Sequence, residues 1–439
     1  MELDAPIRVG VIGAGLFGSN LIDQVERVAG METAAVADVD REKAARSLER
    51  SGLDDEVHLV GDTAEADAAI ADGDRAVLGD GVDLARADVD VVVEATGIPE
   101  VGARHAFVGI TAGTHVVMVT VEADTVVGPL LSRLAERNGV TYSMAYGDQP
   151  ALIVELCDWA RTVGFDVVAA GKWNPYLAEN HHATPEDVFE RIEFDEAFVE
   201  RQNLNPRMYN SFFDGTKVAV EMCAVANATG LKPDVPRMHL PTAEVPEMPA
   251  VLRPKEEGGI LEGTGVVETV SSLYPDGSSV ERDLSLGVFV VTTTPDQRVR
   301  EYLDQYAGTG LYTADDGKYQ LFYRPYHLPG LETTVSVANA ALRNEPTGTP
   351  RERVGEVVAA AKRPLEPGDE LDGGGGYTVY GALVDAGTAD EKGYVPFELL
   401  DGATITGKVD TDGIVTYEKV ELDTDSFLYH LREIQNSTL

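Results

Sequence analysis

A glycine-rich turn near the N-terminus constrains the fold of this chain more than any other feature. The apolar run IRVGVI at residues 7–12 leads directly into GAGLFGSNLI, which places three glycines in the spacing G-x-G-x-x-G ahead of a helical pattern. In this spacing the first glycine allows a tight turn, the second lets the backbone approach a pyrophosphate, and the third lets the helix pack closely on the strand. The anion then lies at the helix N-terminus. The segment predicts a dinucleotide-binding turn formed by Gly13, Gly15, Leu16, Phe17 and Gly18.

The ribose end of this predicted site follows at the end of a second apolar run. Asp38 in TAAVADVD stands about 20 residues after Gly18, the distance at which such folds place an acidic residue. That carboxylate binds a free ribose 2′-hydroxyl and favours NAD, whereas Arg41 is close enough to bind the 2′-phosphate of NADP. The sequence leaves the choice between NAD and NADP open. The alternative is a glycine-rich turn in an α/β fold that binds no nucleotide.

Two further apolar runs, VDVVVEATG and THVVMVTVEAD, are typical of buried parallel strands. Ligands of such sheets bind at the carboxyl ends of the strands. Thr96, Gly97 and the segment from Thr120 to Glu122 are therefore predicted to border the nicotinamide and the substrate in a Rossmann domain, although Glu122 could equally cap the helix that follows.

The composition is strongly acidic, with 75 Asp and Glu against 35 Lys and Arg and a net charge of −40. Such a chain repels nucleic acid and anionic lipid, so neither is expected as a partner. An acidic, lysine-poor surface resembles that of salt-adapted proteins and predicts activity at high salt. We find no apolar run of about 20 residues and no leader pattern, which predicts a cytoplasmic protein.

Two lysines stand at conspicuous places in the middle of the chain. Lys172 follows the apolar run FDVVAAG and precedes Asn174, at a strand tip where a lysine needs water or an anion. Lys217 begins the apolar helical pattern of residues 218–231, where the helix dipole disfavours a positive charge. Asp214 is a reasonable cap for that helix. The functional hypothesis is that Asp214 orients Lys217 toward a substrate.

A third charged group lies in the segment YRPYHLPG, where Arg324 and His327 flank a proline-rich turn. Arginine and histidine on one loop suit a phosphate or carboxylate, and the alternative is a surface loop with the arginine stacked on a tyrosine. From about residue 351 the chain changes to short β-like runs with four consecutive glycines at 373–376. Without a following Lys-Ser/Thr and helix, these glycines favour turns over a phosphate loop.

Several of these segments together resemble one family across nearly the whole chain: GAGLFGS, VEADTVVGP, AYGDQPALI, GKWNP, DGTKVAVEMCAVANATGL, YRPYHL and AAAKRPLEPGDELDGGGGYTVYG. It is the group of homoserine dehydrogenase-like oxidoreductases with a C-terminal SAF domain, whose characterised branch is the 1-deoxy-D-xylulose 5-phosphate reductoisomerase-like enzymes. The resemblance implies NAD(P)H-dependent carbonyl chemistry, with Glu122 near the nicotinamide and a substrate held by Lys172, Asn174, Lys217, Arg324 and His327. Reductoisomerases bind a divalent metal through an aspartate with nearby glutamates. Asp148 stands in the comparable stretch but lacks the neighbouring glutamate. The resemblance therefore does not decide whether Mg²⁺ or Mn²⁺ binds here, and Asp148 is also a candidate substrate ligand.

We therefore expect three domains: a Rossmann NAD(P)-binding domain at 1–147, an α+β catalytic and oligomerisation domain at 148–345, and a small all-β SAF-like domain at 346–439. The predicted function is oxidoreduction of a carbonyl or hydroxyl on a small anionic polyol or phosphosugar, in a homo-oligomer. Lys172 and Lys217 are expected to polarise the carbonyl and supply the proton. The alternatives are homoserine dehydrogenase-type hydride transfer on an amino-acid semialdehyde, a lyase or epimerase with tightly held NAD, and a non-catalytic NAD(P)-binding sensor.

Overall fold

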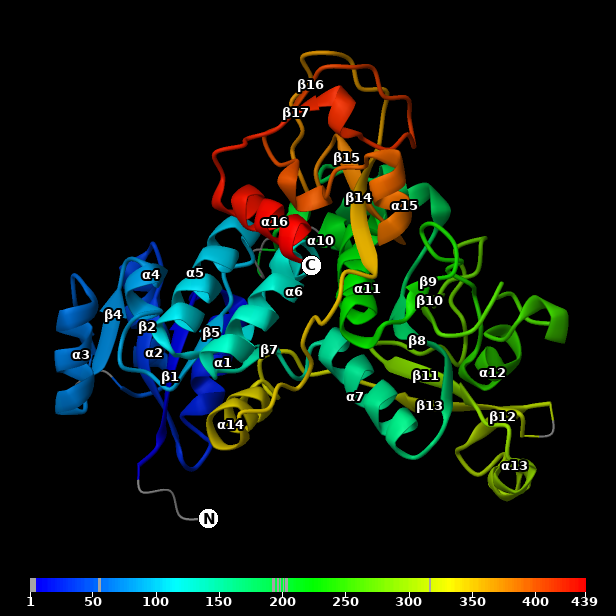
Figure 1. Ribbon diagram of the computed structural model, residues 1–439, viewed down its shortest axis with the longest axis horizontal. Coiled ribbons are helices and arrows are strands. Elements are labelled where there is room, and N and C mark those ends of the chain that lie inside the picture. Colours follow the sequence, from blue (N-terminus) through cyan, green and yellow to red (C-terminus); the bar gives the residue numbers. More distant parts are fainter. Residues whose placement is uncertain are drawn as a thin grey trace. The chain divides into compact units, whose positions relative to one another are not determined.

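The computed structural model describes residues 5–53, 57–191, 194–195, 197, 199, 201, 204–315 and 317–439 (Figure 1). The chain divides into two compact units. The first comprises residues 1–152, 328–351 and 425–439, and the second comprises residues 153–327 and 352–424. The domain boundaries expected at 147 and 345 stay predictions. Within the described residues, we find no helix with both the length and the apolar character that a membrane crossing requires.

The first unit is built on a parallel sheet of seven strands in the order β3-β4-β2-β1-β5-β6-β7. This confirms the predicted α/β fold with an N-terminal Rossmann sheet. Its strands are β1 (Ile7–Ile12), β2 (Met31–Ala37), β3 (Val57–Leu59), β4 (Arg75–Leu78), β5 (Val91–Glu94), β6 (His115–Met118) and β7 (Tyr142–Met144). Its helices are α1 (Leu16–Val25), α2 (Arg41–Arg50), α3 (Thr63–Asp72), α4 (Gly81–Leu84), α5 (Pro99–Ala112), α6 (Val121–Asn138), α14 (Thr334–Arg343) and α16 (Phe427–Thr438).

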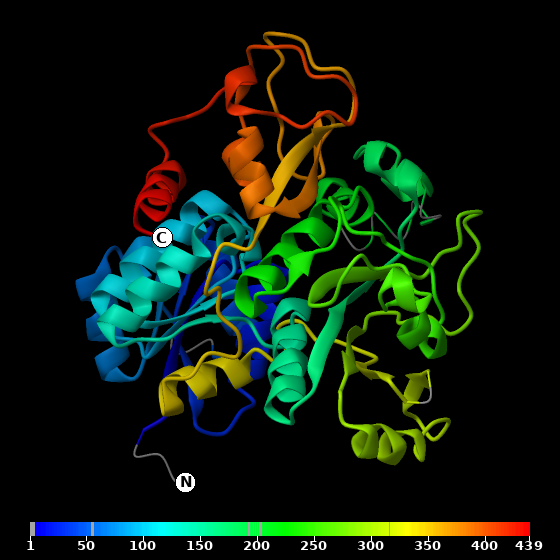
Figure 2. The ribbon, with the colours of Figure 1, turned by 45° about the vertical axis from the view of Figure 1, so that its right-hand side comes forward.

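Helix α16 lies beside α5 and α6 although it comes from the end of the sequence (Figure 2). Pro129 lies inside α6 and cannot donate a backbone hydrogen bond. Close by, the side-chain amide of Gln435 donates to the carbonyl oxygen of Val126 over 2.8 Å and accepts from the backbone N–H of Leu130 over 3.0 Å. One side chain of α16 thus satisfies two backbone groups of α6.

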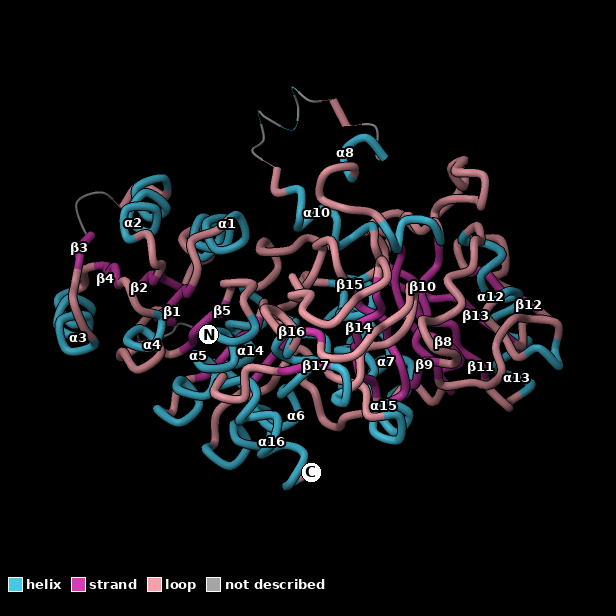
Figure 3. The backbone as a smooth tube through the Cα atoms, turned by 90° about the horizontal axis from the view of Figure 1, so that it is seen from above, coloured by secondary structure: helices cyan, strands magenta, loops and turns pink. Residues whose placement is uncertain are grey.

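The second unit is built on a mixed sheet of six strands in the order β12-β13-β11-β8-β10-β9 (Figure 3). Its strands are β8 (Asp166–Asn174), β9 (Lys232–Pro233), β10 (Val266–Ser271), β11 (Val288–Thr293), β12 (Tyr312–Ala314) and β13 (Tyr319–Arg324). The helices that accompany this sheet are α8 (Val188–Arg191), α10 (Pro206–Phe213), α11 (Thr216–Thr229), α12 (Met248–Val251) and α13 (Gln297–Asp304). Helix α7 (Gln149–Thr162) begins in the first unit and ends in the second. Strand β8 pairs in parallel with β10 and antiparallel with β11.

Two sequence expectations on this unit need correction. Lys172 is not at a strand tip, because β8 continues in register with β10 as far as Asn174. Asp214 is not the N-cap of α11, since that position belongs to Gly215 with a φ of 91°, a left-handed conformation that glycine adopts without strain. The Asp214 carboxylate nevertheless accepts a hydrogen bond from the backbone N–H of Thr216 over 2.9 Å.

The C-terminal region forms the small antiparallel sheets that were predicted and adds two helices. The pairs are β14 (Gly355–Ala361) with β15 (Val379–Asp385) and β16 (Thr404–Ile405) with β17 (Val420–Glu421), and the helices are α15 (Ala386–Lys392) and α16. The four glycines form a turn that packs on α10, as the sequence favoured. A Cβ on Gly375 would lie 2.0 Å from the carbonyl oxygen of Arg207, so only glycine fits there.

Candidate active site

The glycine turn between β1 and α1 has the geometry that a dinucleotide needs. Gly13 has a φ of +97°, and a Cβ on it would lie 2.7 Å from the carbonyl oxygen of Ala95. A Cβ on Gly18 would lie 1.9 Å from the carbonyl oxygen of Gly13, which shows how closely the helix packs on the turn. Gly15, by contrast, faces open space and is the N-cap of α1 without a side-chain cap. The turn therefore leaves room and free backbone donors for a pyrophosphate.

The other residues predicted to bind the dinucleotide lie around this turn in different environments. Leu16 is 79% exposed in the first turn of α1, whereas Phe17 packs against the apolar core. Asp38 lies at the end of β2, where its carboxylate accepts from the backbone N–H of Ala14 over 2.8 Å and lies 3.3 Å from the ammonium of Lys43. It thereby ties the glycine turn to β2, a contact that the sequence did not predict.

Arg41 begins α2 and donates to the carbonyl oxygen of Val60 over 2.8 Å. One nitrogen of its guanidinium is therefore paired with the backbone.

A buried carboxylate lies at the carboxyl ends of β5 and β6. Glu94 is fully buried, and its Oε1 accepts from the hydroxyl of Thr96 over 2.5 Å, while its Oε2 accepts from the hydroxyl of Thr120. The Thr120 oxygen accepts in turn from the backbone N–H of Gly97 over 2.9 Å. This network fixes the loop at residues 96–97, which lies at the predicted edge of the sheet. Glu94 was missed because the strand run VVVE gives no sign that its last residue is buried.

Glu122 lies in the first turn of α6, and Thr120 occupies the N-cap position. The capping alternative for Glu122 is therefore wrong, although its charge suits the positive end of the helix dipole. Beside it, Asp124 is fully buried and its Oδ1 accepts from the Tyr142 hydroxyl. Burial raises the pKa of Asp124 to about 7, and the charges of Glu122 and Glu94 add to this effect.

Asp148 lies at the start of α7, where its carboxylate accepts from the backbone N–H of Gln149 over 2.9 Å. Within the part of the chain that the structure describes, no three His, Cys, Asp or Glu side chains gather so that they would hold a metal ion. The donor set around Asp148 does not match a metal site, and we derive no step through a metal.

Two lysines and one glutamate form the charged centre of the second unit. Lys172 on β8 is 4% exposed and forms an ion pair with Glu221 on α11, which is 3% exposed. Lys217 lies one helical turn before Glu221 and is half-buried. Burial alone would raise the pKa of Glu221, but Lys172, Lys217 and, more weakly, His327 lower it below its usual value. The two predicted lysines thus converge on a carboxylate that the sequence analysis overlooked.

Asp214 has a different partner from the one expected. Its fully buried carboxylate forms an ion pair with Lys362 at 2.8 Å. Lys362 also donates to the carbonyl oxygens of Ala183 and Gly376, both over 2.7 Å. The idea that Asp214 orients Lys217 stays a prediction, and the structure gives its carboxylate the role of holding Lys362.

Arg324 and His327 both lie at the end of β13. The guanidinium of Arg324 lies 4.4 Å above the centre of the Tyr326 ring, which confirms the stacked arrangement considered as the alternative. His327 donates through Nδ1 to the carbonyl oxygen of Leu286 over 2.7 Å. The charge of His327 also lowers the pKa of Glu221, so this residue contributes to the electrostatics of the lysine and glutamate centre.

Comparison with known proteins places this centre in a family context. Residues 147–333 match the family described as Oxidoreductase DRL, catalytic domain. This match indicates an oxidoreductase. The lysine and glutamate centre and the end of β13 lie within the matched residues, whereas Lys362 lies outside them. None of the curated proteins matches the chain.

Among solved structures, myo-inositol dehydrogenase from Lactobacillus casei in complex with NAD(H) and myo-inositol is 19% identical over 42% of this chain, with a TM-score of 0.28. The chain spans only 50% of the length of that protein. A probable dehydrogenase from Thermotoga maritima is 12% identical over 77% of this chain and 90% of its own, with a TM-score of 0.38. The 1-deoxy-D-xylulose 5-phosphate reductoisomerase from Zymomonas mobilis in complex with NADPH is 17% identical over 76% of this chain and 80% of its own, with the same TM-score of 0.38. At these scores nothing about the substrate follows from the similarities.

Proposed function

We propose that the protein is an NAD(P)H-dependent oxidoreductase that acts on the carbonyl or hydroxyl group of a small anionic polyol or phosphosugar. The glycine turn supports the cofactor, and the family match over residues 147–333 supports the class of reaction. The observation that carries the proposal is the buried Lys172–Glu221 pair with Lys217 one turn away. An ionised carboxylate between two ammonium groups can hold one of these ammonium groups in place as a proton donor.

Each residue of this centre has a distinct task in the proposal. Lys172 is almost fully buried and neutralises Glu221, so it acts as a positioning residue. Lys217 is half-buried and is the group that reaches the substrate. Its ammonium polarises the carbonyl oxygen and donates the proton that this oxygen needs when it becomes a hydroxyl. A nicotinamide cofactor, when bound, supplies the hydride.

The anionic end of the substrate is assigned to the end of β13. His327 and Arg324 offer positive or hydrogen-bonding groups there, and such groups recognise phosphate or carboxylate. Asp148 would accept from substrate hydroxyl groups. We also propose that the C-terminal region is an SAF-like domain. We propose that the protein needs high salt, because a net charge of −40 requires counterions.

We further propose that NAD is preferred over NADP. The Asp38 carboxylate stands at the end of β2 with a side chain that is 10% exposed, and a negative charge there opposes a 2′-phosphate. Arg41, the residue that would favour NADP, donates to Val60 instead. The ratio of kcat/KM for NADH and NADPH measures this preference, and a ratio in favour of NADPH would refute it.

The test of the reaction is turnover by pure protein in molar KCl with NADH or NADPH, with and without Mg²⁺ or Mn²⁺. The substrates are 1-deoxy-D-xylulose 5-phosphate, aspartate semialdehyde and a panel of sugar acids and phosphosugars. A Lys217→Ala variant is expected to lose about 10²- to 10⁴-fold in kcat, because the proton donor is gone, while NADH affinity is unchanged. Lys232→Ala is the control, since that side chain is 66% exposed on the same unit.

Each outcome decides between the readings. Near-normal turnover by Lys217→Ala would remove the proposed proton donor. Turnover of aspartate semialdehyde would move the protein to amino-acid metabolism, and cofactor binding without turnover of any substrate would favour a sensor.

A further inference from the structure

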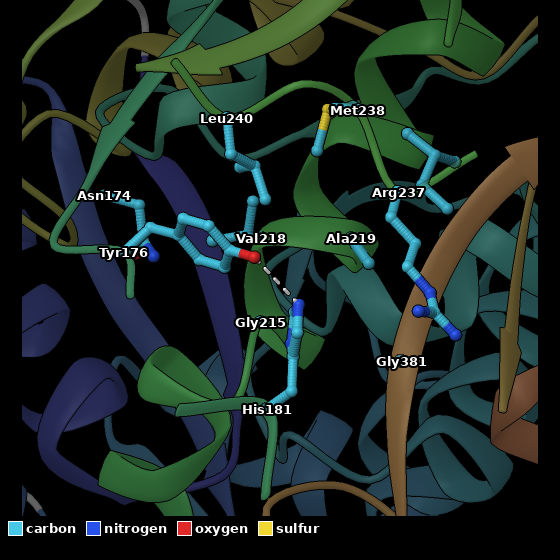
Figure 4. A pocket seen from close by; sticks show the side chains of 11 residues that line it. Asn174, Tyr176, His181, Gly215, Val218, Ala219, Arg237, Met238, Leu240 and Gly381 are labelled. Atoms are coloured by element: carbon cyan, nitrogen blue, oxygen red, sulfur yellow. Dashed lines mark hydrogen bonds between the residues drawn. The ribbon is translucent and has the colours of Figure 1, made fainter. Parts of the chain in front are cut away.

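A small pocket lies entirely within the second unit, and its lining residues Asn174 and Val218 closely follow Lys172 and Lys217 in the sequence (Figure 4). It has about 20 Å³ of free space, which is room for about one water-sized group. Its wall is apolar where α11 and the loop at residues 237–240 meet, and polar where β8 and the segment after it approach. The residues around it are Asn174, Tyr176, His181, Gly215, Val218, Ala219, Arg237, Met238, Leu240, Gly381 and Leu383.

One hydrogen-bond donor in this pocket has no partner. Asn174 is 3% exposed, and its Nδ2 makes no hydrogen bond to any described residue. A buried amide without a partner costs about 1–3 kcal/mol, so a group that satisfies it is expected to bind there. Asn174 lies two residues after Lys172 on β8, and side chains at that spacing point to the same face of a strand.

A tyrosine and a histidine supply an acceptor in the same pocket. The Nδ1–H of His181 donates to the carbonyl oxygen of Asp214 over 2.7 Å, because a carbonyl can only accept. Burial lowers the pKa of His181, which keeps the ring neutral and leaves its Nε2 as an acceptor. The Tyr176 hydroxyl therefore donates to that Nε2 over 3.2 Å, as Figure 4 shows. The lone pairs of the Tyr176 oxygen stay available to accept a hydrogen bond.

The loop opposite holds an unusual backbone conformation. Arg237, Met238 and Leu240 have φ values of 70°, 62° and 52°, in the left-handed region that bulky residues avoid. The fully buried carboxylate of Glu268 fixes the loop by accepting from the backbone N–H of His239 over 3.0 Å and of Leu240 over 3.1 Å. Such strain persists where the surroundings impose it, and it is concentrated at binding sites.

Arg237 is engaged at the rim of the pocket. It donates to the carbonyl oxygen of Asp412 over 2.9 Å, and its guanidinium lies 5.4 Å above the ring centre of Tyr380. The donor that we assign to a ligand inside the pocket is the buried amide of Asn174.

We infer that this pocket is the subsite for the uncharged, hydroxyl-bearing end of the substrate. A hydroxyl both accepts and donates, which matches the Asn174 amide and the Tyr176 oxygen on the polar wall of the pocket. The apolar wall covers the carbon that carries the hydroxyl, and the free space is too small for a phosphate. Asn174 lies two residues after Lys172, about 7 Å along β8, and Lys172 pairs with Glu221, one helical turn after Lys217, so the carbonyl at Lys217 and this hydroxyl are assigned to one small substrate. The inference rests on the proposed function, because it takes Lys217 as the reacting end.

The probes for a test are 5-hydroxypentyl phosphate and n-pentyl phosphate, which differ only in the terminal hydroxyl. Their dissociation constants are measured by calorimetry on the full chain with NADH in molar KCl. We expect the hydroxylated probe to bind the wild-type protein roughly 3- to 10-fold more tightly, which is what one or two satisfied hydrogen bonds contribute. Asn174→Ala and Tyr176→Phe are each expected to bring this ratio close to 1. Tyr274→Phe, at a tyrosine outside the pocket, is the control and keeps the wild-type ratio.

Equal binding of the two probes by the wild-type protein, or binding of neither, would overturn the subsite. A ratio that survives in both Asn174→Ala and Tyr176→Phe would overturn it as well. Circular dichroism of each variant shows whether the loss of the preference for the hydroxylated probe reflects misfolding. Tyr176→Phe removes one oxygen only and is the variant least expected to disturb the fold. Failure of the proposed function has a separate signature, which is normal kcat in Lys217→Ala.

Discussion

The buried carboxylate of Asp124 is expected to make the first unit less stable as the pH rises from about 4 to about 7. Its pKa is raised from 3.8 to about 7, first by burial, and its Oδ2 accepts no hydrogen bond from the described residues. In this window the folded chain binds a proton that the unfolded chain has released, so stability falls with pH. A shift of about three units at about 1.4 kcal/mol each costs about 4 kcal/mol above pH 7. Asp124→Asn keeps an acceptor for Tyr142 without the charge, so its advantage at pH 8 is up to about 4 kcal/mol.

Hydrogen exchange of the α6 peptide, followed by mass spectrometry at pH 5, 6, 7 and 8 in molar KCl, reads this effect in the unit where it arises. The chain has two units, so a global unfolding midpoint would mix their contributions. The quantity of interest is the difference between Asp124→Asn and the wild type, because ionisation of the other carboxylates affects both alike. Asp72→Asn, at an exposed site on the same unit, is the control. A difference that stays constant from pH 5 to pH 8 would refute the reasoning.

Three further outcomes are expected. Gly18→Ala places a Cβ 1.9 Å from the Gly13 carbonyl oxygen, so it should cost about 1–3 kcal/mol in hydrogen exchange of the α1 peptide and abolish NADH fluorescence enhancement; a stable, cofactor-binding variant would contradict the close packing. Gly15→Ala meets no atom within 4 Å, so it should keep wild-type stability and weaken NADH binding at least about 10-fold, and unchanged affinity would place the pyrophosphate elsewhere. The hydrogen bond to Glu268 raises the pKa of His239. The stabilisation of the folded chain by protonated His239 is therefore fully present below about pH 6.5 and is lost as the pH rises through the raised pKa. The stability advantage of the wild type over His239→Gln should shrink between pH 6 and pH 9. An advantage that grows with pH would contradict the raised pKa of His239.

The parts of the fold that depend on neighbouring residues were predictable from the sequence. The glycine turn was predicted because strand, turn and helix are consecutive, and their spacing carries its own geometric reason. Glu221 was missed because it lies in an apolar helical run, four residues after Lys217, and only the tertiary pairing with β8 shows that a lysine covers it. The partner of Asp214 was missed for a similar reason, since Lys362 follows about 150 residues later. Long-range pairs of buried charges leave no local pattern.

The amide of Gln435, which completes the hydrogen bonding of α6, has a consequence for how the protein is made. Synthesis is vectorial, and most domains that form at the beginning of a chain fold while the rest is still on the ribosome. Here the backbone groups of Val126 and Leu130 find their partner about 300 residues later. Until α16 has been synthesised, these two backbone groups of α6 therefore lack their side-chain partner. The first unit is complete only when its last segment, residues 425–439, has been synthesised.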